Sequence, residues 1–305
     1  MNSRTRRWAV VAIVLAVAAA SAIVHEGLLD IRRGEAARAP AASPPHGAGD
    51  DRAVVRIGVV SRFAPNLIYA GYQPLIDYLN AHGRRRYELR PSRDYRDAVE
   101  RLRRGEVAAS FLGAWILRSL GPASGLEPLL GPLNPDGRSR FHDVLIVPRG
   151  SDIRGVVDLA GRRVALPSAD SWAGNWLQTT ALPAAGLDVA DLDTIRHFDH
   201  HQTVVWRVLH GEFDAGVVKE SVAARYGAEG LRVAARSEPI PGPPLVVRAG
   251  DRDPALAEIR ALLLALRPDD ATDAEVLAGW TLEFAGGFGP VHWGDFAATP
   301  PEARP

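Results

Sequence analysis

Cysteine is absent from this chain of 305 residues. Its absence excludes disulfide bonds, thiolate metal sites, a cysteine nucleophile and a lipid-modified N-terminal cysteine. Lysine is limited to Lys219, which we attribute to a composition biased toward arginine. An excess of one charge is also lacking, because 36 basic residues balance 36 acidic ones. The chain therefore has no nucleic-acid-binding signature.

Two catalytic motifs are missing as well. The sequence has no G-x-S-x-G elbow of serine hydrolases and no H-E-x-x-H helix of zinc peptidases. It also shows no internal repeat of fixed period. These absences weigh against an enzyme, and we expect neither a catalytic residue nor a cofactor.

An apolar run follows a basic N-terminus. Arginines at positions 4, 6 and 7 precede the run 8–24, which would be about 25 Å long as a helix. This length is short for a membrane span and long for a signal-peptide core. The small residues 20–22 suit cleavage, whereas the Ala-, Pro- and Gly-rich segment 32–52 suits a tether. We expect a signal peptide or membrane anchor at 1–25 and a flexible linker at 26–52, with both alternatives open.

Strand and helix patterns alternate after the linker. A β-branched run at 53–60 predicts a strand that ends in a polar turn at Ser61. The patterns that follow predict, in order, a helix at 72–83, a strand at 86–92, a helix at 94–106 and a buried strand at 107–115. Such alternation predicts a mainly parallel sheet with its ligand-binding loops at the carboxyl ends of the strands.

A second alternation begins after a strand at 142–150. It predicts strands at 162–167, 194–198 and 214–218, with helices at 174–185 and 203–212. An extended segment, 237–250, and two amphipathic helices then return to the first unit. We predict an α/β fold of two lobes, lobe 1 from residues 54–147 plus 239–297 and lobe 2 from 148–238, joined by a two-segment hinge around a cleft.

Seven segments occur in an order that resembles the phosphate/phosphonate/phosphite-binding periplasmic solute-binding proteins of ABC importers. They are RIGVV with YQPLIDYLN, DYRDAVERLRRGEVAASFLGAW, FHDVLIVPRGSDIRGVVDLAGRRVAL, SADSWAGNWL, HHQTVVWRVLHGEFDAGVV, SEPIPGPPLVV and GGFGPVHWGDF. The resemblance implies a type II bilobal fold, a monomer outside the cytoplasm, a small anionic ligand and an ABC permease partner. A membrane-tethered ligand sensor remains an alternative, as does an enzyme or metal-binding protein on the same fold.

The resemblance also implies an anion-binding loop. Relatives hold an oxyanion with a Ser/Thr-rich loop that opens a helix, and the matching positions here are Ser171, Trp172, Ala173 and Gly174. Two hydroxyls are missing. The free N–H groups and the dipole of a helix N-terminus attract an anion without them. Alternatively, Ser171 is only a helix cap and Trp172 only packs between the lobes.

Four histidines lie in the stretch HFDHHQTVVWRVLHGEFDAGVV, residues 197–218. The resemblance matches His201, followed by Gln202, to a histidine that donates to the anion from a helix N-terminus. His210 is expected to cap the helix or face solvent. His197, His200 and His201 could alternatively bind zinc, but adjacent side chains diverge at a strand-to-loop corner. We therefore expect no metal site.

Three positions depart from the family pattern. Leu112, beside Gly113, replaces an aromatic hydroxyl on the third-strand loop, and Pro243 replaces an acidic residue. Glu220 preserves an acidic residue after the D-A-G strand, one place out of register. Each lost hydrogen bond would leave part of a charged ligand unpaired, at a cost of about 1–3 kcal/mol. The resemblance therefore favours a ligand smaller or less polar than an aminoalkylphosphonate.

Overall fold

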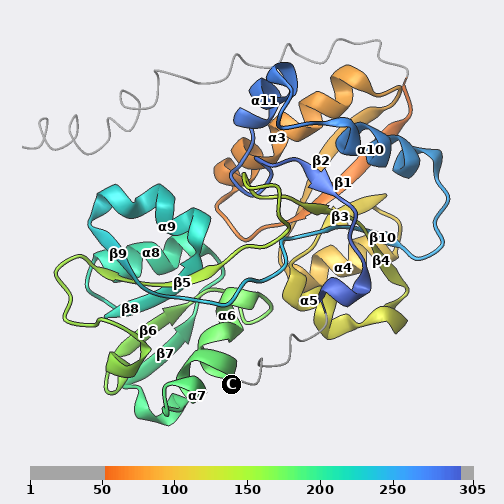
Figure 1. Cartoon of the computed structure of the whole chain (residues 1–305). Coiled ribbons are helices and arrows are strands. Elements are labelled where there is room, and N and C mark those ends of the chain that lie inside the picture. Colours follow the sequence, from red (N-terminus) through yellow and green to blue (C-terminus); the bar gives the residue numbers. More distant parts are fainter. Residues whose placement is uncertain (1–51, 297–305) are drawn as a thin grey trace, which may run out of the picture. The chain divides into compact units, whose positions relative to one another are not determined.

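The structure is a computed structural model that describes residues 52–296. The predictions for the signal peptide or anchor and for nearly all of the linker lie outside the described residues. Residues 52–296 belong to one compact unit that contains a six-stranded and a five-stranded sheet (Figure 1). In this range, no helix has both the length and the apolar character needed to cross a membrane.

The first sheet has the strand order β11-β4-β10-β3-β1-β2. Its strands are β1 Val54–Val60, β2 Arg86–Ser92, β3 Ala109–Phe111, β4 Leu126–Pro132, β10 Leu245–Arg248 and β11 Phe288–Gly289. β1 pairs in parallel with β2 and β3, whereas β10 is antiparallel to β3 and β4, and β11 to β4. The strands β1 to β4 thus run in one direction, as predicted, whereas β10, which returns from the other sheet, and β11 run in the opposite direction.

The helices of this half are α3 Pro65–His82, α4 Tyr95–Arg103, α5 Ala114–Leu120, α10 Pro254–Ala265 and α11 Ala271–Ala278. α3 begins earlier than predicted, since Pro65 occupies its first turn, where a missing N–H is harmless. The predicted strand 107–115 is much shorter, because Gly113 precedes α5 as its N-cap. Apolar faces of α3 and α10 pack on the sheet in one buried cluster.

The second sheet has the order β7-β6-β8-β5-β9. Its strands are β5 Asp143–Pro148, β6 Arg163–Leu166, β7 Thr194–His197, β8 Ala215–Lys219 and β9 Leu231–Arg236. β6 is parallel to β7 and β8, but β5 is antiparallel to both its neighbours. β5 thus belongs to the second sheet, and the chain changes sheets before Asp143, not at the predicted residue 148. The buried side chains of β5 pack into two core clusters of this half.

Three helical segments cover the second sheet. α6 Trp172–Trp176 continues through a π-helical turn, Leu177–Ala181, into α7 Leu182–Ala184, which confirms the helix predicted at 174–185. α8 His201–Leu209 begins two residues before the predicted start, and α9 Glu220–Tyr226 follows β8 directly.

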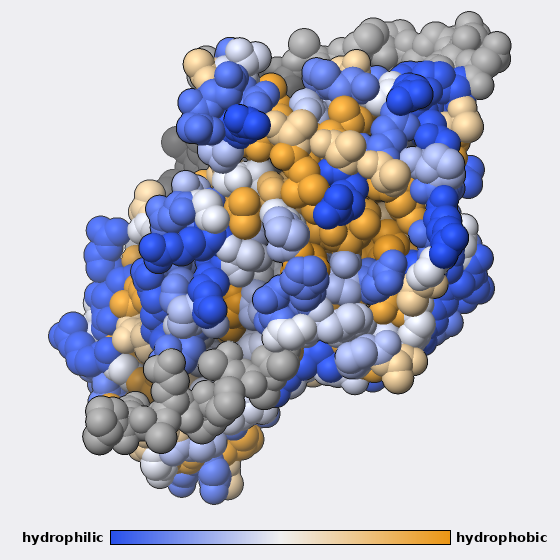
Figure 2. All heavy atoms as spheres, turned by 45° about the vertical axis from the view of Figure 1, so that its right-hand side comes forward, coloured by the Kyte–Doolittle hydropathy of each residue, from blue (hydrophilic) through white to orange (hydrophobic). Residues whose placement is uncertain are grey.

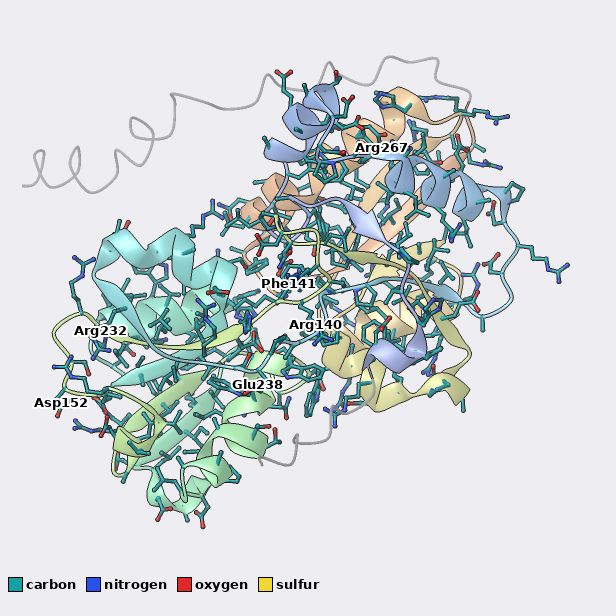
Figure 3. The ribbon with its side chains drawn as sticks, in the orientation of Figure 1. Arg140, Phe141, Asp152, Arg232, Glu238 and Arg267 are labelled. Carbon is teal, nitrogen blue, oxygen red and sulfur yellow. The ribbon has the colours of Figure 1, made fainter. Side chains whose placement is uncertain are left out.

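Two segments connect the halves. Phe141 and Ile240 exchange backbone N–H···O bonds of 2.8 Å, which joins the outgoing and returning segments. Figure 3 shows Arg140 and Phe141 on one segment and Glu238 on the other. The fold is therefore the predicted type II α/β fold with a two-segment hinge. Figure 2 shows hydrophilic residues over most of one face, with an apolar area in its upper half.

Candidate functional site

A small cavity lies where loops from both sheets meet. It encloses about 20 Å³, which is about the space of one water molecule. Arg62 and Gly113 follow β1 and β3, whereas Ser171 follows β6, His201 follows β7 and Lys219 ends β8. These strands run parallel within each sheet, so their carboxyl ends bring the loops together. The cavity therefore lies where the topology predicts a ligand.

Ser171 caps the helix on one side of this cavity. Its hydroxyl donates to the carbonyl oxygen of Ser168 at 2.7 Å and accepts from the Gly174 N–H at 3.0 Å. The hydroxyl proton is thus already engaged within the loop. A Cβ atom on Gly174 would lie 2.1 Å from the Ser168 carbonyl oxygen. Gly174 consequently has a packing role, because only glycine allows this loop to approach the helix.

Trp172 packs between the lobes. Its ring lies edge-on to Trp115 of α5, 5.5 Å between centroids. The Arg118 guanidinium lies 5.2 Å from the Trp115 ring and 5.5 Å from the Trp172 ring. Trp172 contacts core clusters of both halves. The structure thus agrees with the packing alternative for this residue.

His201 is buried against the first lobe. Its side chain is near Phe63, 5.6 Å between ring centroids, and its backbone N–H donates to the Arg62 carbonyl oxygen at 3.3 Å. Neither ring nitrogen has a hydrogen-bond partner among the described residues. Burial, reinforced by Lys219 and Arg62, lowers the pKa of His201 to about 3. The imidazole is therefore neutral at physiological pH and offers one donor and one acceptor.

A buried ion cluster joins the two lobes. Arg62 donates to the Tyr72 hydroxyl at 2.7 Å and to one carboxylate oxygen of Glu283. The other oxygen of Glu283 accepts from Lys219 Nζ at 2.6 Å. Arg62 and Glu283 belong to the first lobe, whereas Lys219 belongs to the second. Burial alone would raise the pKa of Glu283, but Arg62 and Lys219 lower it to about 2, so the carboxylate is ionised.

Asp143 lies beside this cluster at the start of β5. Its side chain is fully buried, and neither carboxylate oxygen has a hydrogen-bond partner within residues 52–296. Its backbone N–H donates to Ser237 Oγ at 3.0 Å. Burial raises the pKa of Asp143 to about 7, although Lys219 opposes the shift. This carboxyl group therefore changes its charge near neutral pH.

We expect Asp143→Asn to stabilise the protein increasingly as the pH rises. Between the ordinary pKa of 3.8 and about 7, the folded protein retains this proton whereas the unfolded chain has lost it. The wild type therefore loses stability as the pH rises through this window. The gain in unfolding free energy should be about 2–4 kcal/mol larger at about pH 8 than at about pH 4. Urea denaturation at both pH values measures it.

Asp97→Asn is the control, because its expected effect on the free energy of unfolding has the opposite sign. The backbone N–H of Arg93 lowers the pKa of Asp97 despite its burial. Its ionised form therefore stabilises the fold above the ordinary carboxyl pKa, and Asp97→Asn should lose stability at about pH 8. Parallel stability curves for the wild type and Asp143→Asn would contradict the role given to Asp143.

Only some of the predicted site residues line the small cavity. Gly113, Ser171, Trp172, Ala173 and His201 line the small cavity. Leu112 is fully buried in the core of the first lobe and does not line it. Ligand contact by the five lining residues stays a prediction.

The other candidates lie around larger neighbouring cavities or outside them. Gln202 accepts from the Ala64 N–H at 3.2 Å and lines a cavity of about 420 Å³. Glu220 pairs with Arg236 and lines a cavity of about 310 Å³. Ser61 lines none of these three cavities.

Sequence reasoning missed the three charged residues at the centre of the site. Arg62 immediately follows the candidate Ser61, and Lys219 is the only lysine and ends the D-A-G strand. Both signals were available in the sequence. Glu283 has no such signal, because it lies in an apolar segment after α11 and meets Arg62 across 221 positions.

The histidine side chains of the segment 197–201 do not converge on one point. His197 Nδ1 lies 2.7 Å from the Pro167 carbonyl oxygen, and Nε2 lies 3.1 Å from the Gln178 amide. His201 instead faces the interior of the cavity region. In the described part of the chain, no group of three or more His, Cys, Asp or Glu side chains is arranged to hold a metal ion. The described geometry therefore gives the zinc alternative for the H-x-x-H-H segment no support.

Comparison with known families agrees with this geometry. A family model for the ABC transporter, phosphonate, periplasmic substrate-binding protein matches residues 57–295. The chain belongs to this family. The family consists of transporter subunits that bind solutes in the periplasm, and it is not an enzyme family.

Solved structures share the fold at low sequence identity. A binding-protein component of an ABC phosphonate transporter from Pseudomonas aeruginosa is 17% identical, with a TM-score of 0.67, over 78% of this chain and 81% of that one. PhnD1 from Prochlorococcus marinus, in complex with methylphosphonate, is 16% identical, with a TM-score of 0.67, over 80% and 94%. A Xanthomonas citri protein bound to chloride is 25% identical, with a TM-score of 0.60, over 78% and 91%.

Proposed function

We propose that this chain is the extracytoplasmic solute-binding subunit of an ABC importer and that it captures a small phosphorus oxyanion, such as phosphate, phosphite or a phosphonate. The observation that carries the proposal is the meeting of two cations from opposite lobes, Arg62 and Lys219, at one small cavity. An anion between these cations would hold the lobes together.

Neutral donors near the cations favour an oxyanion. The helical segment that begins at Trp172 presents its N-terminus to the small cavity, where Trp172 and Ala173 are lining residues, and such a terminus attracts negative charge. His201 adds an imidazole donor that stays neutral because its pKa is about 3. A tetrahedral oxyanion has enough oxygens to accept from a guanidinium, an ammonium and these neutral donors together.

The small volume implies that the lobes must part before a solute enters. A cavity of about 20 Å³ holds about one water and is too small for a tetrahedral oxyanion. The two-segment hinge at Phe141 and Ile240 provides the necessary axis. The described arrangement therefore corresponds to a closed form of the binding protein.

A binding screen tests the function. Methylphosphonate, phosphate, phosphite and methanesulfonate are added separately to the purified protein, and the melting temperature and the heat of binding are measured. A phosphorus oxyanion should raise the melting temperature, because it binds only the folded form. Binding of a neutral solute, with no response to any of the four anions, would overturn the proposal.

His201→Ala should weaken binding of the oxyanion about tenfold, the amount expected for one hydrogen bond to a charged partner. His210→Ala is the matched control, since His210 stacks on Trp206 outside the three cavities. For a ligand of fixed charge, the ratio of the affinities of wild type and His201→Ala should stay constant between about pH 6 and 8, because His201 remains neutral there. Isothermal titration of both variants measures the effect, and equal affinity of His201→Ala and wild type would assign His201 to packing alone.

A membrane-tethered ligand sensor is the second candidate. The observation that favours it is the apolar run 8–24 followed by the tether-like segment 32–52 in a chain without a cysteine for lipid attachment. A neighbouring ABC permease gene would favour the importer subunit over the sensor. Mass spectrometry of the exported protein shows whether residues 1–25 are retained, which the tether requires.

A further inference from the structure

Glu283 occupies the position between the two cations that we assign to the solute. One carboxylate oxygen accepts from Arg62 and the other accepts from Lys219 Nζ at 2.6 Å. The Glu283 side chain is 4% exposed, as is that of Arg62. A first-lobe carboxylate therefore already makes the bridging contact that an anion between the lobes would make.

The same ion pair borders three cavities. Lys219 lines both the cavity of about 20 Å³ and that of about 310 Å³. Glu283 lines the cavity of about 310 Å³ and that of about 420 Å³. A movement of the Glu283 side chain away from Lys219 would therefore free the cation of the small cavity, and larger cavities lie beside the pair.

No other group nearby replaces Glu283 as the counterion of Arg62 and Lys219. Tyr72 offers Arg62 only a neutral hydroxyl, because burial raises the Tyr72 pKa further above neutrality. His201 is neutral, and Asp143, whose pKa burial raises to about 7, makes no hydrogen bond to either cation. Without Glu283, Arg62 and the largely buried Lys219 would face each other with only the partly ionised Asp143 nearby, which is costly. The closed arrangement therefore depends on a carboxylate or on another anion in its place.

We propose that Glu283 is a built-in pseudo-ligand that closes the empty protein and lowers its affinity for every anion, because a solute must displace this carboxylate from Arg62 and Lys219. The proposal rests on the proposed function. The cost of displacement is the same for a monoanion and a dianion, so a preference between them comes from Arg62 and Lys219 and not from Glu283. Glu283 thus sets how tightly the protein binds anions of either charge.

Closure is tested without any ligand. Spin labels are attached to Val157→Cys in the second lobe and Arg260→Cys in the first, two exposed positions in a chain without cysteine, and the distance between them is measured by pulsed electron resonance. The wild type should give one short distance, and Glu283→Gln a longer one. Glu258→Gln, which breaks a carboxylate pair with Arg85 inside the first lobe, should resemble the wild type. An unchanged distance in Glu283→Gln would overturn the proposal.

Displacement is tested with methylphosphonate and methanesulfonate, which have the same tetrahedral shape. At a pH where methylphosphonate is a dianion, Glu283→Gln should bind each anion at least tenfold more tightly than the wild type does, and the ratio of the two affinities should stay the same. Unchanged affinities for both anions would overturn the proposed displacement.

Two further outcomes are informative. If Glu283→Gln opens but neither anion binds either protein, the proposed function fails while the role of Glu283 in closure is supported. If Glu283→Gln does not fold, Glu283→Asp provides the measurement. Its shorter side chain keeps the charge but cannot reach both cations, so it should give a mixture of short and long distances. A single short distance in Glu283→Asp would overturn the proposal.

Discussion

Arg62→Ala is expected to lower the free energy of unfolding by about 3–5 kcal/mol, the range for removal of one partner from a buried ion pair. The guanidinium is 4% exposed and donates to both Tyr72 and Glu283. Its removal leaves the buried Glu283 carboxylate with Lys219 alone among the partners described here. Urea denaturation near neutral pH, where Glu283 is ionised, measures the loss.

Arg85→Ala is the matched control for this prediction. Arg85 also pairs with a glutamate of the same lobe, Glu258, at 2.9 Å, but its side chain is 27% exposed. Its removal should cost less than about 1 kcal/mol, because water screens the pair. Equal losses for Arg62→Ala and Arg85→Ala would show that the buried cluster does not stabilise the fold more than a surface pair does.

Gly174→Ala should be the second most damaging change, with a loss of about 3 kcal/mol in unfolding free energy, at the upper end of the usual cost of overpacking. The new methyl group would lie 2.1 Å from the Ser168 carbonyl oxygen and 2.9 Å from that of Pro167. Both oxygens belong to the backbone, so no side-chain rotation relieves the clash. Thermal and urea denaturation measure the effect.

Gly227→Ala provides the comparison, because Gly227 has φ −60° and ψ −33° and a Cβ atom there would meet nothing within 4 Å. This change should alter stability by less than about 0.5 kcal/mol. A similarly small effect of Gly174→Ala would mean that the loop 167–171 moves away from the helix without cost.

Local sequence patterns predicted the helices and strands that have one apolar and one polar face. α4 was predicted from its apolar stripe, and Asp94 caps it by accepting from the Asp97 N–H at 2.8 Å. β4 was missed because Pro128, Gly131 and Pro132 interrupt its pattern. β9 was missed because it is an edge strand with only Leu231 buried, so it has no alternation to detect.

The residues of the candidate site also divide into those that the sequence could predict and those that it could not. Ser171 and His201 were predicted because the family resemblance matches them to a loop and a histidine that open helices, and the structure places both beside the small cavity. The Arg62–Glu283 contact could not, because it joins positions 221 residues apart through tertiary packing. Burial, which follows from tertiary packing, then decides the state of individual side chains. It places Leu112, predicted to contact the ligand, in the core, and it keeps His201 neutral, which the sequence left open.

The two tryptophans that meet between the lobes give the protein an intrinsic optical reporter. Trp115 and Trp172 belong to different lobes and share the Arg118 guanidinium. Indole emission depends on hydration and on neighbouring charge, so separation of the lobes would shift the fluorescence spectrum. Domain motion can therefore be followed in real time on the unlabelled wild-type chain.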